Sequence, residues 1–188
     1  MKIWTVALVM LTALHSSARA HELQASRATL VLRDNQHLAV AFFVDYPAVL
    51  HQALAPQMLF REFALQHSAM PAQVFAAALA TAQRKLQSAT RVVSHGGKTI
   101  ELKMWAWPTA AATQQAVQQR AMQAVVAPGD HAHTPQTEIR AEAQSTNPRA
   151  FASVTLQLPV ELKDTLLVSY QPKQVWVKTG TASPLIRF

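Results

Sequence analysis

Three of the eight histidines are candidate ligands for a metal ion, because of their positions in the sequence. Cleavage after Ala20 would make His21 the first residue of the exported protein. A terminal histidine offers its amine, with a reference pKa of about 8, and the Nδ1 atom of its own ring, which together close a chelate ring around an ion. One further imidazole would complete a T-shaped site of three nitrogen atoms, which suits Cu(II). We therefore predict a metal site at His21, with copper favoured; the alternative is an ordinary solvent-exposed terminus.

His131 and His133 are the best candidates for the second ligand. Side chains two residues apart in an extended segment point to the same side, so both rings would reach a single ion. Asp130 would orient one of these rings as a hydrogen-bond partner behind the metal. The alternative is that residues 130–133 form a solvated loop without a metal.

Residues 1–20 have the composition of a secretory signal peptide. Lys2 precedes an apolar run of 12 residues, and the segment ends in small residues with Ala18 and Ala20 at the spacing of a cleavage site. Such a run is too short for a membrane span, which needs roughly 20 residues. We expect a periplasmic or secreted protein with one domain over 21–188 and no later transmembrane segment. Processing before Arg19 would instead abolish the terminal histidine site.

Composition excludes several classes of site and activity. The chain has no cysteine, so disulfides, thiolate metal sites and cysteine nucleophiles are ruled out. Its net charge of +7, from 17 basic and 10 acidic residues, falls to +5 when Lys2 and Arg19 leave with the signal peptide. The basic residues that are left are spread along the sequence, which indicates a mildly basic surface and no nucleic-acid partner. No Gly-x-Ser-x-Gly or His-Glu-x-x-His motif of a hydrolase occurs, so we predict that the protein is not an enzyme. An oxidative copper enzyme acting on polysaccharide would need a flat aromatic face near His21.

Apolar patterning predicts a mainly β chain with a helical insertion, of the α+β class. Helices are expected near 48–88, broken at Pro56, and over 109–126; Ser68 is expected to cap the helix over 69–88. A Gly-Gly turn at 95–98 predicts a hairpin. The expected strands are 23–33, 38–45, 90–94, 98–107, 137–143, 151–158, 165–170 and 174–178. This order fits an antiparallel β-sandwich, Ig-like in layout.

Other residues able to bind a ligand are interpreted as structural. Isolated histidines in turns or helices are expected at the surface or partly buried, and scattered methionines are expected to fill the core. The tryptophans at 105 and 107 share a strand face and are expected to pack in the core. The histidines are His37, His51, His67 and His95, and the methionines are Met58, Met70, Met104 and Met122.

The chain resembles two groups of exported proteins. His21 at the predicted terminus is similar to the start of copper proteins that bind the ion through an amino-terminal histidine brace. The layout from His21-Glu22-Leu23 through the hairpin at 95–98 to Leu158-Pro159 resembles the exported amino-terminal domains of HupE/UreJ-type membrane proteins. That resemblance implies a role in metal uptake. The transmembrane helices that follow in that family are missing here, so it implies no transport activity.

Two functions follow from these patterns and remain open at this point. The first is binding or delivery of a metal ion through His21 with His131 or His133. The second is a non-catalytic periplasmic interaction or accessory domain without a metal, which binds an envelope or membrane protein. The second function predicts a binding surface at an exposed strand edge or in the region 48–67.

Overall fold

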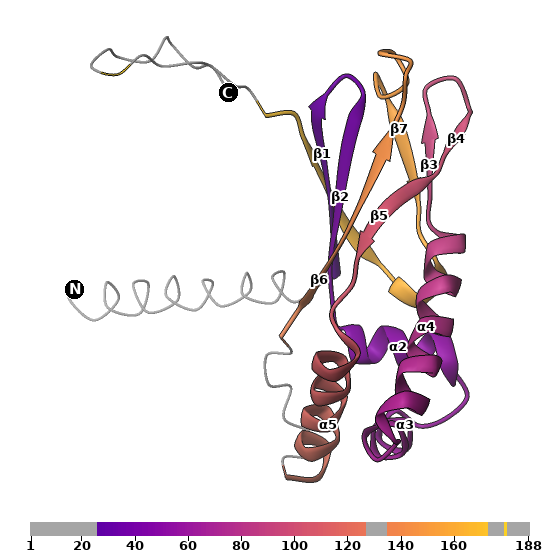
Figure 1. The fold of residues 1–188 in the computed structure, drawn as a ribbon, viewed down its shortest axis with the longest axis vertical. Helices are drawn as coiled ribbons and strands as arrows, with labels where there is room; N and C mark the ends of the chain where they lie inside the picture. Colours follow the sequence, from indigo (N-terminus) through magenta and orange to yellow (C-terminus); the bar gives the residue numbers. More distant parts are fainter. Residues whose placement is uncertain (1–25, 127–134, 173–178, 180–188) are drawn as a thin grey trace, which may run out of the picture.

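Two β-sheets and four α-helices make up the part of the chain that the computed structural model describes, residues 26–126, 135–172 and 179 (Figure 1). The larger sheet has the order β5-β6-β2-β1-β8. These strands are Leu102–Ala106, Thr137–Gln144, His37–Val44, Ser26–Asp34 and Thr165–Tyr170. The smaller sheet has the order β4-β3-β7, formed by Thr99–Ile100, Arg91–Ser94 and Val154–Gln157. The fold is therefore mixed α+β.

The β1–β2 hairpin forms the centre of the larger sheet and follows directly from alternation. Every second residue of β2 is buried, from Leu38 to Val44, and Ala28 and Leu30 of β1 face the same side. Asp34 closes the turn by accepting a hydrogen bond from the backbone N–H of Gln36 at 2.7 Å. The predicted strands 23–33 and 38–45 are confirmed over the described residues.

The strands that flank this hairpin come from the second half of the chain. β6 pairs antiparallel with β2, and β8 pairs parallel with β1. A parallel neighbour cannot be reached through a tight turn, so the whole intervening chain serves as the connection between β1 and β8. The predicted strands 137–143 and 165–170 are confirmed, 151–158 is confirmed only over β7, and 174–178 lies outside the described residues.

The predicted strand 98–107 is wrong as one unit because the chain changes sheets within it. β4 pairs with β3 in the smaller sheet, whereas β5 pairs with β6 in the larger one. The β5–β6 register shifts between Lys103 and Ala106, and Met104 adopts a positive φ of 49°. The hairpin itself is confirmed: Gly97 has a φ of 75°, and the Ser94 N–H donates to the Lys98 carbonyl at 2.9 Å.

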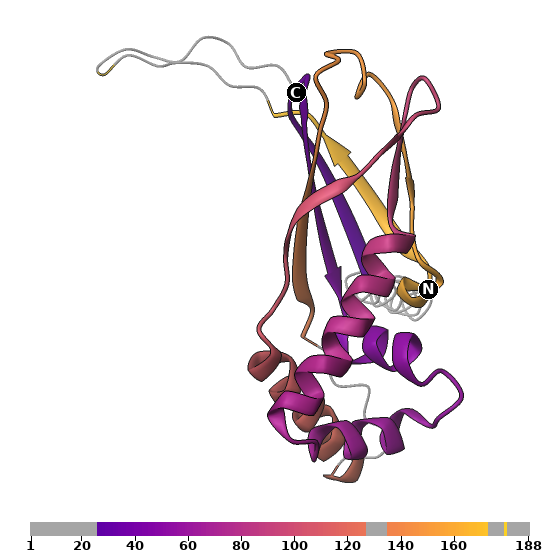
Figure 2. The same cartoon turned by 45° about the vertical axis from the view of Figure 1, so that its right-hand side comes forward.

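The helices gather at one end of the sheets, with the β1–β2 and β3–β4 turns at the other (Figure 2). They confirm the predicted helical regions, including the break around Pro56. Ser68, however, ends a helix rather than capping the next one: its Oγ donates to the Leu65 carbonyl, and Pro71 occupies the N-cap of α4. The helices are α2 (Tyr46–Leu54), α3 (Phe60–Ser68), α4 (Ala72–Ala89) and α5 (Ala110–Val126), with a 3₁₀ turn η3 (Val160–Leu162).

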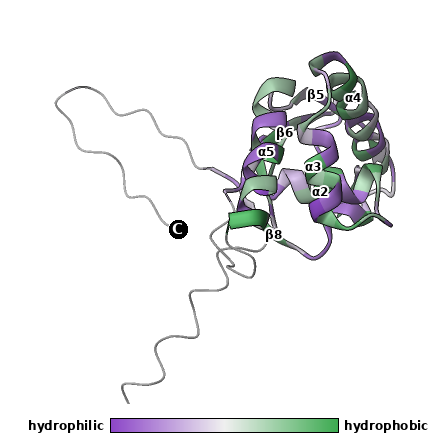
Figure 3. Ribbon diagram, turned by 90° about the horizontal axis from the view of Figure 1, so that it is seen from below, coloured by the Kyte–Doolittle hydropathy of each residue, from purple (hydrophilic) through white to green (hydrophobic). Residues whose placement is uncertain are grey.

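One cluster of buried side chains joins both sheets and all four helices. Phe42 of β2, Val92 of β3, Phe63 of α3 and Val117 of α5 are each at most 2 % exposed. Seen from the helical end, α2, α3 and α5 show both hydrophilic and hydrophobic segments (Figure 3). This shared core fixes the larger sheet relative to the helices, and it leaves the opposite face of that sheet uncovered by any described element.

Candidate functional site

The end of the larger sheet nearest the helices is where both predicted ligand segments join the fold. The register sets Arg27 of β1 and Glu138 of β6 on either side of Phe43 of β2. β1 and β6 therefore both begin at this end, flanking the last residues of β2. Neighbouring strands lie about 4.8 Å apart, so the starts of β1 and β6 are about 10 Å apart.

The four predicted site residues, His21, Asp130, His131 and His133, lie outside the described residues. In sequence, the predicted segments come shortly before Ser26 of β1 and Thr137 of β6.

A small cavity of about 190 Å³ lies at this sheet end between α5 and the start of β6. The Asp45 carboxylate lines it and accepts a hydrogen bond from the Arg120 guanidinium at 2.9 Å. Burial raises the pKa of Asp45, although the Arg120 charge and the Ala48 N–H oppose that rise. Because Arg120 occupies its carboxylate, Asp45 joins α5 to the start of α2 rather than offering a free ligand.

The described histidines are held by hydrogen bonds within the fold. The ring nitrogens of His51 and His67 donate to the carbonyls of Met58 at 2.7 Å and Phe63 at 2.9 Å. Both rings are buried, at 7 % and 6 % exposed, deeper than the sequence predicted. Nδ1 of His95 contacts the Ser153 hydroxyl, and His37 pairs with Asp34. Across the described ranges, no three potential metal ligands come together.

The methionines divide between core and surface. Met58 and Met70 pack against the buried cluster, as predicted. Met104 and Met122 are 59 % and 66 % exposed, so the prediction that they fill the core is wrong. The positive φ of Met104 breaks the alternation on which its predicted position depended.

The two tryptophans of the β5 segment are confirmed as packing residues. Trp105 stacks on Phe42 with ring centroids 6.0 Å apart and on Trp107 at 5.1 Å, and Trp107 stacks on Tyr46 at 5.9 Å. The Trp105 Nε1–H donates to the Leu102 carbonyl at 3.0 Å. Rings held in this way do not form a flat exposed aromatic face.

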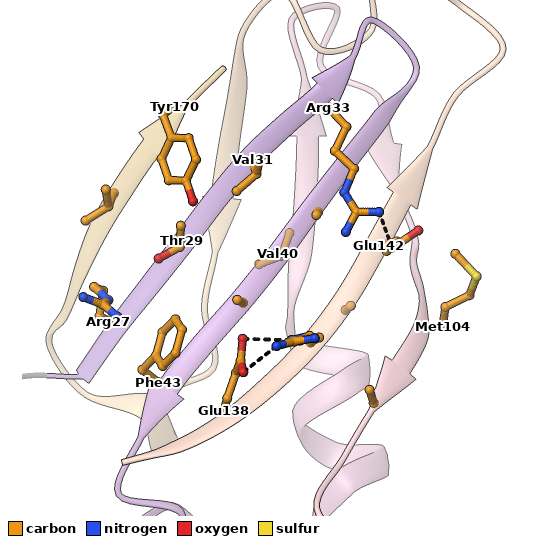
Figure 4. Close-up of a pocket in the computed structure, with 16 residues that line it drawn as sticks. Arg27, Thr29, Val31, Arg33, Val40, Phe43, Met104, Glu138, Glu142 and Tyr170 are labelled. Carbon is orange, nitrogen blue, oxygen red and sulfur yellow. Dashed lines mark hydrogen bonds and ion pairs between the residues drawn. The ribbon is translucent and has the colours of Figure 1, made fainter. Parts of the chain in front are cut away.

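Sequence analysis missed the surface on the far side of the larger sheet, which we call the outer face (Figure 4). It encloses a shallow hollow of about 550 Å³. Arg140 donates to both carboxylate oxygens of Glu138 at 2.8 Å, and this bonding lowers the Glu138 pKa. Strand alternation was the available signal, since it puts every second residue of a strand on the same face. The lining includes Arg27, Thr29, Val31, Arg33, Ala39, Ala41, Phe43, Glu138, Arg140, Glu142, Val168 and Tyr170.

Comparison with protein-family models, curated proteins and solved structures finds no match for this chain. The resemblances to HupE/UreJ-type and histidine-brace proteins therefore stay predictions. Among the helices of the described ranges, none combines the length and apolar character needed to cross a bilayer.

Proposed function

We propose that this chain is an exported protein, periplasmic or secreted, that binds or delivers a metal ion, with copper favoured. The ligands are the amine and ring of His21 and the imidazole of His131 or His133. The main support is the strand register at one sheet end, where β1 and β6 begin on either side of β2. Because His21 precedes β1 and residues 131 and 133 precede β6 in sequence, this arrangement supports a shared site.

The chemistry of the ligand set favours Cu(II). The terminal amine loses its proton to the ion near neutral pH, and a neutral imidazole supplies the next nitrogen. The Asp130 carboxylate fixes the orientation of the adjoining ring by accepting its second N–H. Every ligand is nitrogen in this scheme, which agrees with a chain that lacks cysteine.

A copper titration tests this function on protein that has been exported and processed. One added residue before His21 moves the amine away from the ring, and we expect it to weaken Cu(II) binding by more than about tenfold. His131→Gln and His133→Gln identify the second ligand, and His95→Gln is the matched control on a histidine bonded to Ser153. Intact mass with and without chelator reports the processing site and the bound ion. Equal affinity for the extended and native termini would refute the site.

A second function, a non-catalytic interaction domain that binds an envelope or membrane protein, is favoured by the edge strand β8. Within the described residues β8 pairs with β1 alone. Leu166, Leu167 and Tyr170 on β8 are about half exposed. An uncharged apolar edge of this kind is suited to pairing with another chain. A pull-down from envelope extract tests this function. Recovery of one stoichiometric protein by the native chain but not by Leu166→Lys would support it. Recovery by both would exclude this edge as the binding surface.

We also propose that the two sheets are the layers of an antiparallel β-sandwich, Ig-like in layout, within one exported domain. The buried cluster shared by both sheets supports this arrangement. The parallel β1–β8 pair departs from it. A crystal structure of the exported protein tests the layout through the packing angle of the two sheets.

A further inference from the structure

We propose that the outer face of the larger sheet binds an extended acidic segment of a partner protein, with Arg27 holding one of its carboxylates. This proposal deepens the interaction-domain function, on which it rests, and it requires no metal ion. Arg27 lies at the start of β1, directly opposite Phe43 on β2 (Figure 4). The shape of the face, its charge and its apolar margin all support this occupant.

Small side chains on the central strand give the outer face its hollow. Ala39 and Ala41 of β2 face outward, opposite Val31 and Thr29 of β1. On β6 their register partners are Glu142 and Arg140, whose side chains are longer than those of the two alanines and so form one side of the hollow. β1 runs along the face from Arg27 to Arg33, a length of about 20 Å at about 3.3 Å per residue. The hollow thus has room for roughly six residues of extended chain.

Among the described residues of this face, one arginine side chain has no carboxylate partner. Arg140 is bound by Glu138, and Arg33 donates to Glu142 at 3.2 Å. Arg27 has no carboxylate within ion-pair distance among the described residues. Its guanidinium carbon instead lies 4.4 Å from the centre of the Phe43 ring, and its Nε is buried without a hydrogen-bond partner in the described part of the chain.

A carboxylate is the group that completes this arrangement. A guanidinium stacked on an aromatic ring keeps its edge free, and that edge binds a carboxylate through two parallel hydrogen bonds. Nucleic acid fits less well, because its binding needs several free cations along a phosphate chain. Here the glutamates at 138 and 142 already neutralise the other two arginines and would repel phosphates. The charge of the face therefore selects an isolated carboxylate.

An apolar margin beside Arg27 indicates that the ligand also carries apolar side chains. The parallel register sets Leu166, Val168 and Tyr170 of β8 beside Arg27, Thr29 and Val31, so they share the outer face. Leu166 and Tyr170 are 52 % and 54 % exposed. Tyrosine and arginine are the residue types that dominate binding energy at protein interfaces. A peptide in which acidic and apolar residues alternate matches both halves of this surface.

Fluorescence anisotropy with a labelled peptide of about ten residues, in which glutamate alternates with leucine, tests the proposal. A second peptide with glutamine in place of glutamate measures the contribution of charge. We expect the exported protein to prefer the glutamate peptide by about tenfold, and Arg27→Gln to abolish that preference. Ala41→Phe fills the hollow and should weaken binding of both peptides.

Matched controls lie on the smaller sheet. Arg91→Gln removes an exposed strand arginine and Thr155→Phe adds a ring at an exposed strand position, and neither should change peptide affinity. Chemical-shift mapping on the unmutated protein supplies a readout that no folding defect affects, with the largest shifts expected at Thr29, Ala41 and Phe43. The proposal would be overturned if Arg91→Gln lost the preference for the glutamate peptide as completely as Arg27→Gln. That result would show that the peptide binds through net charge alone.

Two further outcomes would also overturn the assignment. One is binding of a single-stranded oligonucleotide or of anionic vesicles that depends on Arg27 while neither peptide binds. The other is an envelope partner whose capture Arg27→Gln and Ala41→Phe leave unchanged, which would retain the interaction function but exclude this face. A failed copper titration affects neither result, so the two proposals are tested separately.

Discussion

The ion pair between Lys85 and Glu161 joins η3 to α4. Removing it should lower the free energy of unfolding by an amount that depends on pH. Glu161 is only 7 % exposed, and the Lys85 ammonium lies 2.8 Å from its Oε1. The same ammonium donates to the Ala53 carbonyl at the end of α2 at 3.2 Å. Lys85 therefore joins three elements, and Lys85→Met removes that connection while keeping the length of the side chain.

Burial, the largest influence on Glu161, pushes its pKa up. The hydrogen bond and charge of Lys85, together with a backbone hydrogen bond, outweigh burial and hold the pKa below its ordinary value. A lowered carboxyl pKa contributes stability above the pKa of the unfolded chain, and that stability is lost as the pH falls through the folded value. Without Lys85 only the backbone hydrogen bond opposes burial, so the Glu161 pKa should rise in the variant.

The expected cost follows from the geometry of the pair. A hydrogen bond to a charged group contributes about 1.5–3 kcal/mol, and the half-exposed Lys85 side chain places this one near the lower end. We expect Lys85→Met to lower the free energy of unfolding by about 2 kcal/mol at neutral pH. The loss should shrink towards pH 4, where Glu161 becomes protonated in the variant.

Urea denaturation followed by circular dichroism at neutral pH and near pH 4 measures both values. Lys103→Met is the matched control, because Lys103 and Glu101 are both exposed and lie 3.9 Å apart. That control should change the free energy of unfolding by less than about 0.5 kcal/mol. The assigned role of the ion pair is wrong if Lys85→Met changes the free energy of unfolding no more than the control at neutral pH, or if its cost is the same at both pH values.

Two further predictions concern β5. Met104→Gly should raise the free energy of unfolding by roughly 0.5 kcal/mol, because glycine adopts the positive φ of this exposed residue without strain. Met104→Val should lower it, because a β-branched side chain is strained at that φ. Urea denaturation that ranks the two variants in the opposite order would contradict this. Trp105→Phe should cost about 1 kcal/mol more than Trp107→Phe, because Trp105 donates to the Leu102 carbonyl while the buried Trp107 Nε1 has no partner in the described part of the chain. Equal thermal stability of the two variants would contradict this.

Local patterning predicted most of the elements correctly. Alternation in β2 and the apolar stripe of α4 each involve neighbours in sequence, so they identified a strand and a helix without knowledge of the rest. The sheet change at Glu101 was missed because the same alternation continues from Ile100 to Leu102 whether or not the chain changes partners. The predicted position of Met104 failed because its positive φ breaks the alternation after Leu102.

The candidate sites differ in what sequence could provide. His21 was chosen for its chemistry, and its distance from His131 or His133 depends on strand order, which no local pattern encodes. The outer face was hidden for a related reason. Alternation predicts the face of the strand to which the side chains of Arg27 and Ala41 point. Only the register sets Arg27 beside Phe43 and leaves it without a carboxylate among the described residues.

Side-chain types and periods of two or 3.6 residues were enough to indicate the candidate ligands, the absence of thiol chemistry and the position of most helices and strands. Only the folded chain shows that β8 joins β1 in parallel, that β1 and β6 begin at one sheet end, and that Met104 and Met122 are exposed. Pairing between distant strands depends on how the whole core packs, and a core is a property of many side chains at once.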